Sequence, residues 1–487
     1  MICPSGERKK YTMISFNLAV KNRDNFANSG ELFPFLCAKF LKMPEIESEL
    51  EEMYRECVQR LYSIAPSFQK VGALGYHPGL ETMSDFSAYL GDPHKSLTAV
   101  HIAGTNGKGS VAHMLASALA SAYPGERIGL YTSPHLVDFR ERIKLVSSAT
   151  GEVGEHFSMI GKREVLDFMH RAGSFIEERT PSFFEITTAM AFDYFNRENV
   201  RVAVIETGLG GRLDSTNIIV PRLSVITSIG IDHKDVLGDT IEQIASEKAG
   251  IIKPGVPVVV GDVPDSAYDV IRTRAEQCGS RLYRAGELCD ECVGAVVAAS
   301  EADLHAACQE KNIRTVLTAL MVLGMEAVRR DSGIYEAIIH SAAITGLRGR
   351  WERLSSSPEV ICDIGHNVEA VSVSMRQLAK EAGGRHIIMV YGMAADKDVE
   401  SVCRLLPDDA EYIMTQARGS RAMPALLLKE TARKECSVAV PDVEQAVRLA
   451  LSKAGDDDVI FIGGSSYVVA EVLEKWSEIT GNKKVKI

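Results

Sequence analysis

Short apolar runs alternate with amphipathic stretches over most of this chain. Residues 97–102, 202–205 and 223–229 are predominantly apolar runs of strand length, and they are separated by longer segments with helical spacing. Strands that are apolar on both sides are typical of a parallel sheet covered by helices on its two faces. The pattern therefore predicts an α/β fold with a doubly wound, mostly parallel sheet and right-handed crossovers.

The same pattern predicts the remaining elements of the first part of the chain. Further strands are expected at residues 127–132 and 256–260, and helices at 111–120, 163–171, 184–195, 240–249 and 316–329. A helical pattern also rises after Met43-Pro44, where acidic residues precede apolar ones, whereas residues 1–42 show weak periodicity. We therefore interpret residues 1–43 as an atypical extension, with the hypothesis that native translation starts at Met43.

The alternation restarts beyond a segment rich in glycine and arginine. Residues 345–350 read Thr-Gly-Leu-Arg-Gly-Arg, a composition that favours a boundary between domains. Four strand-like runs follow it, at residues 360–363, 386–391, 411–415 and 459–462. The predicted organisation is a central domain over residues 44–344, a hinge over 345–350 and a smaller Rossmann-like α/β domain over 351–487.

A glycine-rich loop lies between the first predicted strand and the first predicted helix. Residues 103–110 read Ala-Gly-Thr-Asn-Gly-Lys-Gly-Ser. Glycines let successive N–H groups and the helix N-terminus converge on a phosphate, while Lys108 adds a charge and Ser110 offers a hydroxyl to Mg²⁺. The strict phosphate-loop pattern is not met, because Ile102 occupies the first glycine position and Gly109 separates Lys108 from Ser110. This variant loop predicts binding of ATP or GTP.

Polar residues follow three other predicted strands. Ser133 and Glu206 come directly after their strands, and His233 lies in the loop after a third. Because the carboxyl ends of parallel strands meet at one sheet edge, these residues and the phosphate loop are expected to form one composite site. Glu206 suits a magnesium ligand and a neutral His233 could ligate a second metal. The alternatives are that Glu206 is a turn residue and that His233, which considered singly is more often solvated, is an ordinary loop histidine.

Composition excludes several classes of protein. The formal net charge of −11 over 487 residues disfavours nucleic-acid binding. No stretch approaches the roughly 18 consecutive apolar residues of a membrane span, and no export signal is evident. The ten cysteines are scattered, and Cys289 and Cys292 have zinc-knuckle spacing without a second pair. We predict a cytoplasmic protein with reduced thiols that is monomeric and binds neither nucleic acid nor membrane.

Several ordered motifs resemble those of the folylpolyglutamate synthase and dihydrofolate synthase family of the Mur ligase superfamily. The motifs are residues 103–110, 131–136, 206–217, 231–233 with 247–251, 349–352, Asp363 with His366-Asn367, 396–398 and Gly464-Ser465. The resemblance extends from about Tyr54 to about Glu474. It implies a P-loop, Mur-ligase-like central ATPase domain followed by a C-terminal glutamate-ligase domain.

The resemblance also implies which residues bind nucleotide and metal. The expected ATP-binding residues are Gly107, Lys108, Gly109, Ser110, Asn312, Arg350 and Asp363. The expected magnesium ligands, at two sites, are Ser110, Ser133, Glu206 and His233. Lys248 matches a lysine that the family carries as a carbamate, which places oxygen ligands where an ammonium would repel Mg²⁺. Lys108, His233 and Lys248 are the expected catalytic residues, although Lys248 considered alone would be an exposed lysine near a helix C-terminus.

A substrate pocket follows from the same resemblance. Its expected residues are Ser182, Phe184, Leu213, Asp214 and Ser215. An aromatic face and a carboxylate suit a flat pterin that forms hydrogen bonds. The chain departs from the family at Ser215, where alanine is common, and at residues 363–367, where Asp-Ile-Gly-His-Asn replaces Asp-Gly-Ala-His-Asn.

The implied activity is an ATP-dependent ligase that joins L-glutamate to dihydropteroate, to reduced folates, or to both, through an acyl phosphate. Asp214 favours the bifunctional enzyme, and the alternatives are a folylpolyglutamate synthase only, another Mur-type amino-acid ligase and a non-catalytic ATP-binding switch. A ligase for UDP-linked substrates is disfavoured, because only about 60 residues separate Met43 from the phosphate loop, too few for a further domain. Since an acyl phosphate reacts with water, the second domain is expected to close over the first.

Overall fold

The computed structural model describes residues 32–65, 79–148, 156–285, 287, 299–325 and 333–481. The chain divides into two units, Met1–Glu56 and Cys57–Ile487. Helix α2 (Leu32–Ile64) contains the helix predicted after Met43-Pro44 but begins well before it, so only the predicted start is wrong. Pro44 instead lies inside the helix, where it leaves one backbone carbonyl without its amide donor. The Cys289 and Cys292 pair lies outside the described residues.

An eight-stranded sheet forms the first half of the larger unit. Its strand order is β4-β3-β2-β5-β1-β6-β7-β8. The strands are β1 (Ala99–Ala103), β2 (Ile128–Tyr131), β3 (Ile143–Val146), β4 (Phe157–Met159), β5 (Val202–Glu206), β6 (Leu223–Ser228), β7 (Val258–Asp262) and β8 (Leu282–Arg284). Neighbours from β2 to β8 are parallel, whereas β3 and β4 form an antiparallel edge. The doubly wound fold is confirmed, and β3, β4 and β8 were not predicted.

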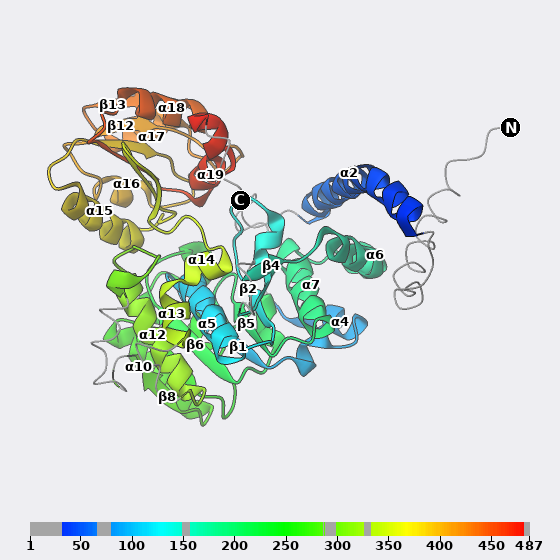
Figure 1. The fold of residues 1–487 in the computed structure, drawn as a ribbon. Helices are drawn as coiled ribbons and strands as arrows, with labels where there is room; N and C mark the ends of the chain where they lie inside the picture. The colour runs from blue at the N-terminus through cyan, green and yellow to red at the C-terminus, as the bar shows by residue number, and fades with distance from the viewer. Residues whose placement is uncertain are drawn as a thin grey trace. The chain divides into compact units, whose positions relative to one another are not determined.

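Helices cover both faces of this sheet. They are α4 (Glu81–Tyr89), α5 (Lys108–Ala122), α6 (Lys162–Arg179), α7 (Phe183–Arg197), α8 (Lys234–Leu237), α9 (Ile241–Ala249), α10 (Asp265–Gln277), α12 (Gln309–Val322), α13 (Gly333–Ile339) and α14 (Ser341–Thr345), with 3₁₀ turns η2 (Pro93–Ser96), η3 (Phe139–Arg142) and η4 (Ser215–Ile218). Helices α5, α12 and α13 pack together over one face, where Ile102 and Val204 are buried (Figure 1). Helices α9 and α10 pack over Val258 and Val260 on the opposite face. Burial on both sides explains why the strands are apolar throughout.

A six-stranded sheet follows, in the order β13-β12-β11-β14-β10-β9. Its strands are β9 (Glu352–Ser356), β10 (Glu359–Cys362), β11 (Ile387–Tyr391), β12 (Glu411–Met414), β13 (Ser437–Ala439) and β14 (Val459–Gly463), and its helices are α15 (Val368–Ala382), α16 (Val399–Cys403), α17 (Ala425–Ala432), α18 (Val443–Lys453) and α19 (Ser466–Thr480). Met389 packs under α15 to α17, and Val390 packs under α18 and α19. The predicted second α/β sheet is confirmed, whereas the exact domain boundaries stay predictions.

The carboxyl ends of four parallel strands lie side by side at one edge of the central sheet. Strand β1 pairs with β5 through Ile102 and Glu206, and with β6 on its other side. Strand β2, which precedes Ser133, pairs with β5. The phosphate loop, Ser133, Glu206 and the loop to His233 therefore leave the same edge, as the sequence predicts. None of the helices in the described ranges has the length and apolar content needed to cross a membrane.

Candidate active site

The phosphate loop wraps around its own lysine. Lys108 begins helix α5, and its Nζ donates to the carbonyl oxygens of Gly104 at 3.0 Å and Thr105 at 3.3 Å. Gly107 caps the helix with a φ of 85°, a conformation that favours glycine. A Cβ at Gly107 would also clash with Oδ1 of Asn312, so the side chain of Asn312 lies directly against the loop. The loop thus presents helix N–H groups and one ammonium to an anionic ligand.

A cavity of about 670 Å³ adjoins this loop. Its lining includes all seven residues predicted to bind ATP: Gly107, Lys108, Gly109, Ser110, Asn312, Arg350 and Asp363. Ser133 and Glu206 line the same cavity. The structure therefore brings together residues that are more than 200 positions apart in the chain, although their individual roles stay predictions.

Arg350 reaches the phosphate loop from the predicted hinge. A Cβ at Gly109 would lie 3.6 Å from Nη2 of Arg350 and 3.7 Å from Oε2 of Glu206, so both side chains flank the loop. Arg350 is partly buried, and burial lowers its pKa. Asp363 accepts hydrogen bonds from the backbone N–H groups of Trp351 and Gly365, both at 2.9 Å. This carboxylate thereby anchors the segment that carries Arg350.

Glu206 is a buried carboxylate beside the loop. One oxygen accepts a hydrogen bond from the backbone N–H of Ser133 at 3.1 Å. Burial raises the pKa of Glu206 to about 7, against the opposing effect of Lys108. Within the described residues, no three His, Cys, Asp or Glu side chains are grouped to hold a metal. A magnesium ion here would need hydroxyl and phosphate oxygens besides Glu206, and Mg²⁺ commonly binds through one carboxylate, substrate phosphates and water.

His233 lies on the other side of Ser133. Its backbone has a φ of 52°, and its N–H donates to Oδ1 of Asp232 at 2.9 Å. Burial lowers the pKa of His233 to about 3, so the imidazole is neutral and able to ligate a metal. His233 lines a second cavity, and Ser133 lines both cavities. Ser133 therefore connects the predicted metal ligands Ser110 and Glu206 with His233.

Lys248 is buried, which corrects its interpretation as an exposed lysine. Only 4% of the residue is accessible, because α9 packs Ile244 and Ala245 into the core beside β6. Its Nζ donates to the carbonyl oxygen of Gly104 at 2.9 Å, the same oxygen that accepts from Lys108. Burial and the charge of Lys108 lower the pKa of Lys248 to about 7. Two amino groups thus meet at one carbonyl oxygen under the phosphate loop.

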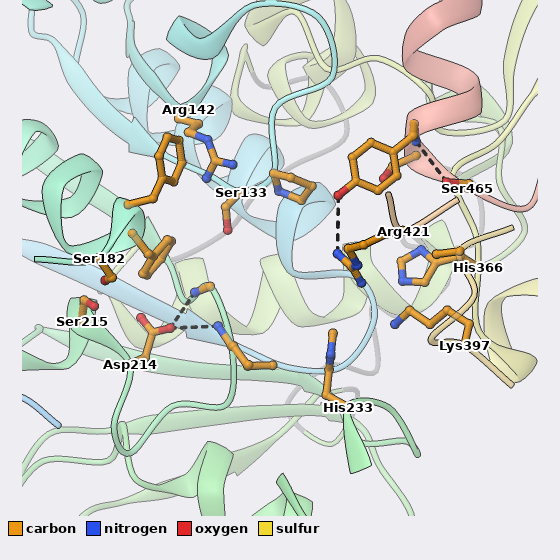
Figure 2. A pocket seen from close by; sticks show the side chains of 18 of the residues that line it. Ser133, Arg142, Ser182, Asp214, Ser215, His233, His366, Lys397, Arg421 and Ser465 are labelled. Carbon is orange, nitrogen blue, oxygen red and sulfur yellow. Dashed lines mark hydrogen bonds between the residues drawn. The ribbon is translucent and has the colours of Figure 1, made fainter. Parts of the chain in front are cut away.

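The second cavity has a volume of about 210 Å³, and residues from both the first and the second α/β half line it. The five residues predicted to bind substrate, Ser182, Phe184, Leu213, Asp214 and Ser215, all line it, and Ser182, Asp214 and Ser215 lie together at one end (Figure 2). Oδ2 of Asp214 accepts from the backbone N–H groups of Gly208 and Leu209, each at 2.8 Å. Its Oδ1 accepts from the backbone N–H and the hydroxyl of Thr216. Asp214 therefore holds the shape of this end of the cavity.

A buried histidine stands behind Asp214, and sequence reasoning missed it. Nε2 of His101 lies 2.8 Å from the hydroxyl oxygen of Thr216. Since that hydroxyl donates to Asp214, His101 is the donor to Thr216. Burial lowers the pKa of His101 to about 3, which keeps the ring neutral. A histidine in an apolar strand gives no signal of this contact in the sequence.

The opposite end of the second cavity carries cations. Lys397, Arg421, His366 and Ser465 lie at this end (Figure 2), and Tyr467 also lines the cavity. Nζ of Lys397 lies 2.7 Å from Oδ1 of Asp232, and Arg421 pairs with Asp396. Sequence reasoning did not assign these cations to a site. Lys397 lies in the Asp-Lys-Asp motif and could have been found from it, whereas the sequence around Arg421 carries no such signal.

Comparison with known proteins shows which family this chain belongs to. The Mur ligase middle domain family matches residues 102–317, and the Mur ligase glutamate ligase domain family matches residues 349–466. The dihydrofolate synthase/folylpolyglutamate synthase of Bacillus subtilis (strain 168) is 32% identical over 424 residues, which cover 82% of this chain and 95% of that protein. This chain belongs to the folylpolyglutamate synthase and dihydrofolate synthase family. Like its relatives in that family, it is an ATP-dependent amide ligase.

Solved structures of the family share the fold. A structure of Escherichia coli FolC in complex with DHPP and ADP has a TM-score of 0.72 at 28% identity, with 87% of this chain and 98% of that chain covered. A Yersinia pestis bifunctional folylpolyglutamate synthase/dihydrofolate synthase, with Mn, AMPPNP and L-glutamate bound, has a TM-score of 0.68 at 29% identity, with 82% and 95% covered. The predicted Mur-ligase-like fold is thereby confirmed.

Proposed function

We propose that this ligase joins L-glutamate both to dihydropteroate and to reduced folates. The observation that carries the proposal is the second cavity, which has an aromatic end with Asp214 and a cationic end with Lys397, and which shares Ser133 with the nucleotide cavity. The Bacillus subtilis relative is named for both activities, which supports the bifunctional form.

The shared wall at Ser133 suggests how the two cavities cooperate. A substrate whose ring lies against Phe184 would direct its carboxylate towards Ser133 and so towards the γ-phosphate of ATP. A carboxylate oxygen would attack the γ-phosphorus as ADP leaves, and the resulting acyl phosphate would lose phosphate when the amine of glutamate attacks its carbonyl carbon. Lys108 and Arg350 would offset the repulsion between the anionic carboxylate and the phosphate.

The glutamate would occupy the cationic end of the second cavity. Its two carboxylates match the ammonium of Lys397 and the guanidinium of Arg421, which Asp232 and Asp396 hold in place. Its amine would then point towards Ser133, where the acyl phosphate forms. A matching pair of cations disfavours a substrate amino acid without a second carboxylate.

Magnesium binding belongs to the proposal. Ser110, Ser133 and Glu206 would hold one ion beside the phosphates, and His233 would contribute to a second. The buried carboxylate of Glu206 and the nearby hydroxyls fit a hard cation that prefers oxygen ligands. When bound, the metal would supply neutralisation of phosphate charge. Mn-bound structures of the Yersinia pestis relative support use of a divalent ion.

We also propose that Lys248 carries a carbamate. Its neutral amine would add CO₂, forming an N–C bond and releasing one proton. Burial next to Lys108 supports this, because the carbamate would replace a repelling positive charge with a negative one. Carbon-13 NMR of protein equilibrated with labelled bicarbonate should show a carbamate signal that is absent from Lys248→Ala.

Phosphate release tests the proposed activity directly. Purified protein would be assayed with ATP, Mg²⁺ and L-glutamate, with either dihydropteroate or tetrahydrofolate, and the products identified by mass. Activity with both substrates is expected. Activity with tetrahydrofolate alone would limit the enzyme to polyglutamylation, and activity with neither would indicate another amino-acid ligase. We further propose that the protein is cytoplasmic and monomeric. Size-exclusion chromatography with light scattering would test its oligomeric state.

A further inference from the structure

The predicted hinge is held firmly at its first end by Lys144. This lysine comes from the antiparallel strand β3, and its Nζ donates to the carbonyl oxygens of Thr345 at 2.8 Å and Gly346 at 3.2 Å. The ammonium is buried and lies 5.0 Å from the centre of the Phe157 ring. A buried cation that donates to two backbone carbonyls fixes the chain at this point.

A second side chain, His113, holds the same end. His113 lies in helix α5, which begins at Lys108 of the phosphate loop, and its Nδ1 is 2.6 Å from the hydroxyl oxygen of Thr345. That hydroxyl donates to the carbonyl oxygen of Ser341, so His113 must be the donor to Thr345. Burial lowers the pKa of His113, in agreement with a neutral ring that carries its proton on Nδ1. A hydrogen bond thus joins helix α5, which follows the phosphate loop, directly to the hinge.

The far end of the hinge is held by the C-terminal sheet. The backbone N–H of Ile364 donates to the carbonyl oxygen of Gly349 at 3.1 Å, and the N–H of Gly349 donates to Glu352 at 2.7 Å. Trp351 is fully buried in the core of that sheet. Arg350 therefore belongs structurally to the second set of contacts.

The two sets of contacts meet between Leu347 and Arg348. The N–H of Leu347 donates to the carbonyl oxygen of Ala342 in α14, on the first side, at 3.2 Å. The side chain of Arg348 donates to Glu352, on the second side, at 2.6 Å. Within the predicted six-residue hinge as the structure describes it, only the peptide between Leu347 and Arg348 is therefore free of both sets of contacts. Arg350 lies two residues after Arg348.

We propose that Lys144 and His113 are positioning residues that place Arg350 in the nucleotide site. They fix the first side of the single connecting peptide, and the residues on its second side carry the Arg350 guanidinium to the phosphate loop and Glu206. Lys144 contacts the nucleotide only through this chain of bonds. Loss of either donor releases the first side of that peptide, so the second side shifts and the guanidinium moves away from the phosphates.

A double-mutant cycle on nucleotide affinity tests this directly. Calorimetry would measure the Kd of AMPPNP with Mg²⁺ for wild type, Lys144→Met, Arg350→Ala and the combination. We expect Arg350→Ala to weaken binding about tenfold and Lys144→Met about fivefold, with the combination no weaker than Arg350→Ala alone, because both act through one guanidinium. Effects that multiply in the combined variant would overturn the proposal.

A matched pair at Thr345 guards against a simple loss of folding. Thr345→Val keeps the size of the side chain and removes the oxygen that His113 contacts, whereas Thr345→Ser keeps that oxygen. We expect weaker AMPPNP binding for the valine variant alone, with thermal unfolding of both variants within a few degrees of wild type. Equal affinities for the two variants would overturn the proposal. The assay needs only nucleotide, so its outcome is independent of the folate substrates.

Discussion

The two ends of the second cavity are built in different ways. At the aromatic end, Asp214 is held by Gly208, Leu209 and Thr216, all within eight positions of it in the chain. At the cationic end, Lys397 is held by Asp232, which lies 165 positions away in the other half of the molecule. One end is therefore assembled by local contacts, and the other exists only when the two halves meet.

This difference has a consequence for the order of binding. A site assembled locally is preorganised and keeps its affinity when the C-terminal half moves. A site that needs both halves gains affinity only on closure. The pterin substrate should therefore bind before glutamate, and variants at the two ends should affect different Michaelis constants.

The largest effect is expected for a residue of the nucleotide cavity, because the reaction needs ATP whichever pterin substrate is bound. Lys108→Ala removes the phosphate-loop ammonium, so phosphate release should fall by at least about two orders of magnitude with either pterin substrate. Circular dichroism should show that the variant stays folded. Turnover near that of wild type would contradict the assignment of the nucleotide site.

The cationic end should respond to loss of a single charge. Lys397→Met should raise the KM for L-glutamate about tenfold, because a charge-assisted hydrogen bond contributes about 1.5–3 kcal/mol. The KM for dihydropteroate should stay within about twofold of wild type. Lys453→Met is a matched control, since Lys453 also pairs with a carboxylate but lies at the surface. A change in the KM for both substrates would contradict the separation of the two ends.

The aromatic end should respond in the opposite way. Asp214→Asn places an amide group against backbone N–H donors, so the KM for dihydropteroate should rise about fivefold and the free energy of unfolding should fall by about 1–3 kcal/mol. The KM for L-glutamate should change little. Asp269→Asn is the control, expected to stay within about twofold of wild type, because Asp269 also pairs with a neighbouring group but lies at the surface.

The smallest effect concerns Glu206, which lines the nucleotide cavity. Burial raises its pKa from 4.5 to about 7, so the folded protein binds more protons than the unfolded chain between these pH values. The contribution of Glu206 to the free energy of unfolding therefore decreases as pH rises through that window. Urea unfolding without metal should show a weaker decrease from pH 5 to 7 for Glu206→Gln. Identical slopes would contradict the buried carboxylate.

The sequence predicted the parallel strands because continuous apolar runs report burial on both faces. Strand β3 was missed because its Lys144 interrupts the apolar pattern, and β9 because most of its residues are only partly buried. The strand-to-loop rule placed Ser133 and Glu206 at one edge correctly. The burial of Lys248 could not be predicted, because it depends on how α9 packs against a distant strand. Arg421 was missed for the same reason, since only the tertiary structure brings it to the cavity.

The bond between His101 and Thr216 constrains how this enzyme can evolve. His101 lies in the strand that leads into the phosphate loop, and Thr216 lies beside the predicted pterin site. Replacing Thr216 alone leaves Nε2 of His101 without its acceptor, at a cost of about 1–3 kcal/mol. A lineage that replaces Thr216 to fit another ring is therefore expected to replace His101 as well, whereas His101 can change alone. The hydrogen bond from the His101 imidazole therefore couples substitutions beside the substrate pocket to the strand that carries the nucleotide loop.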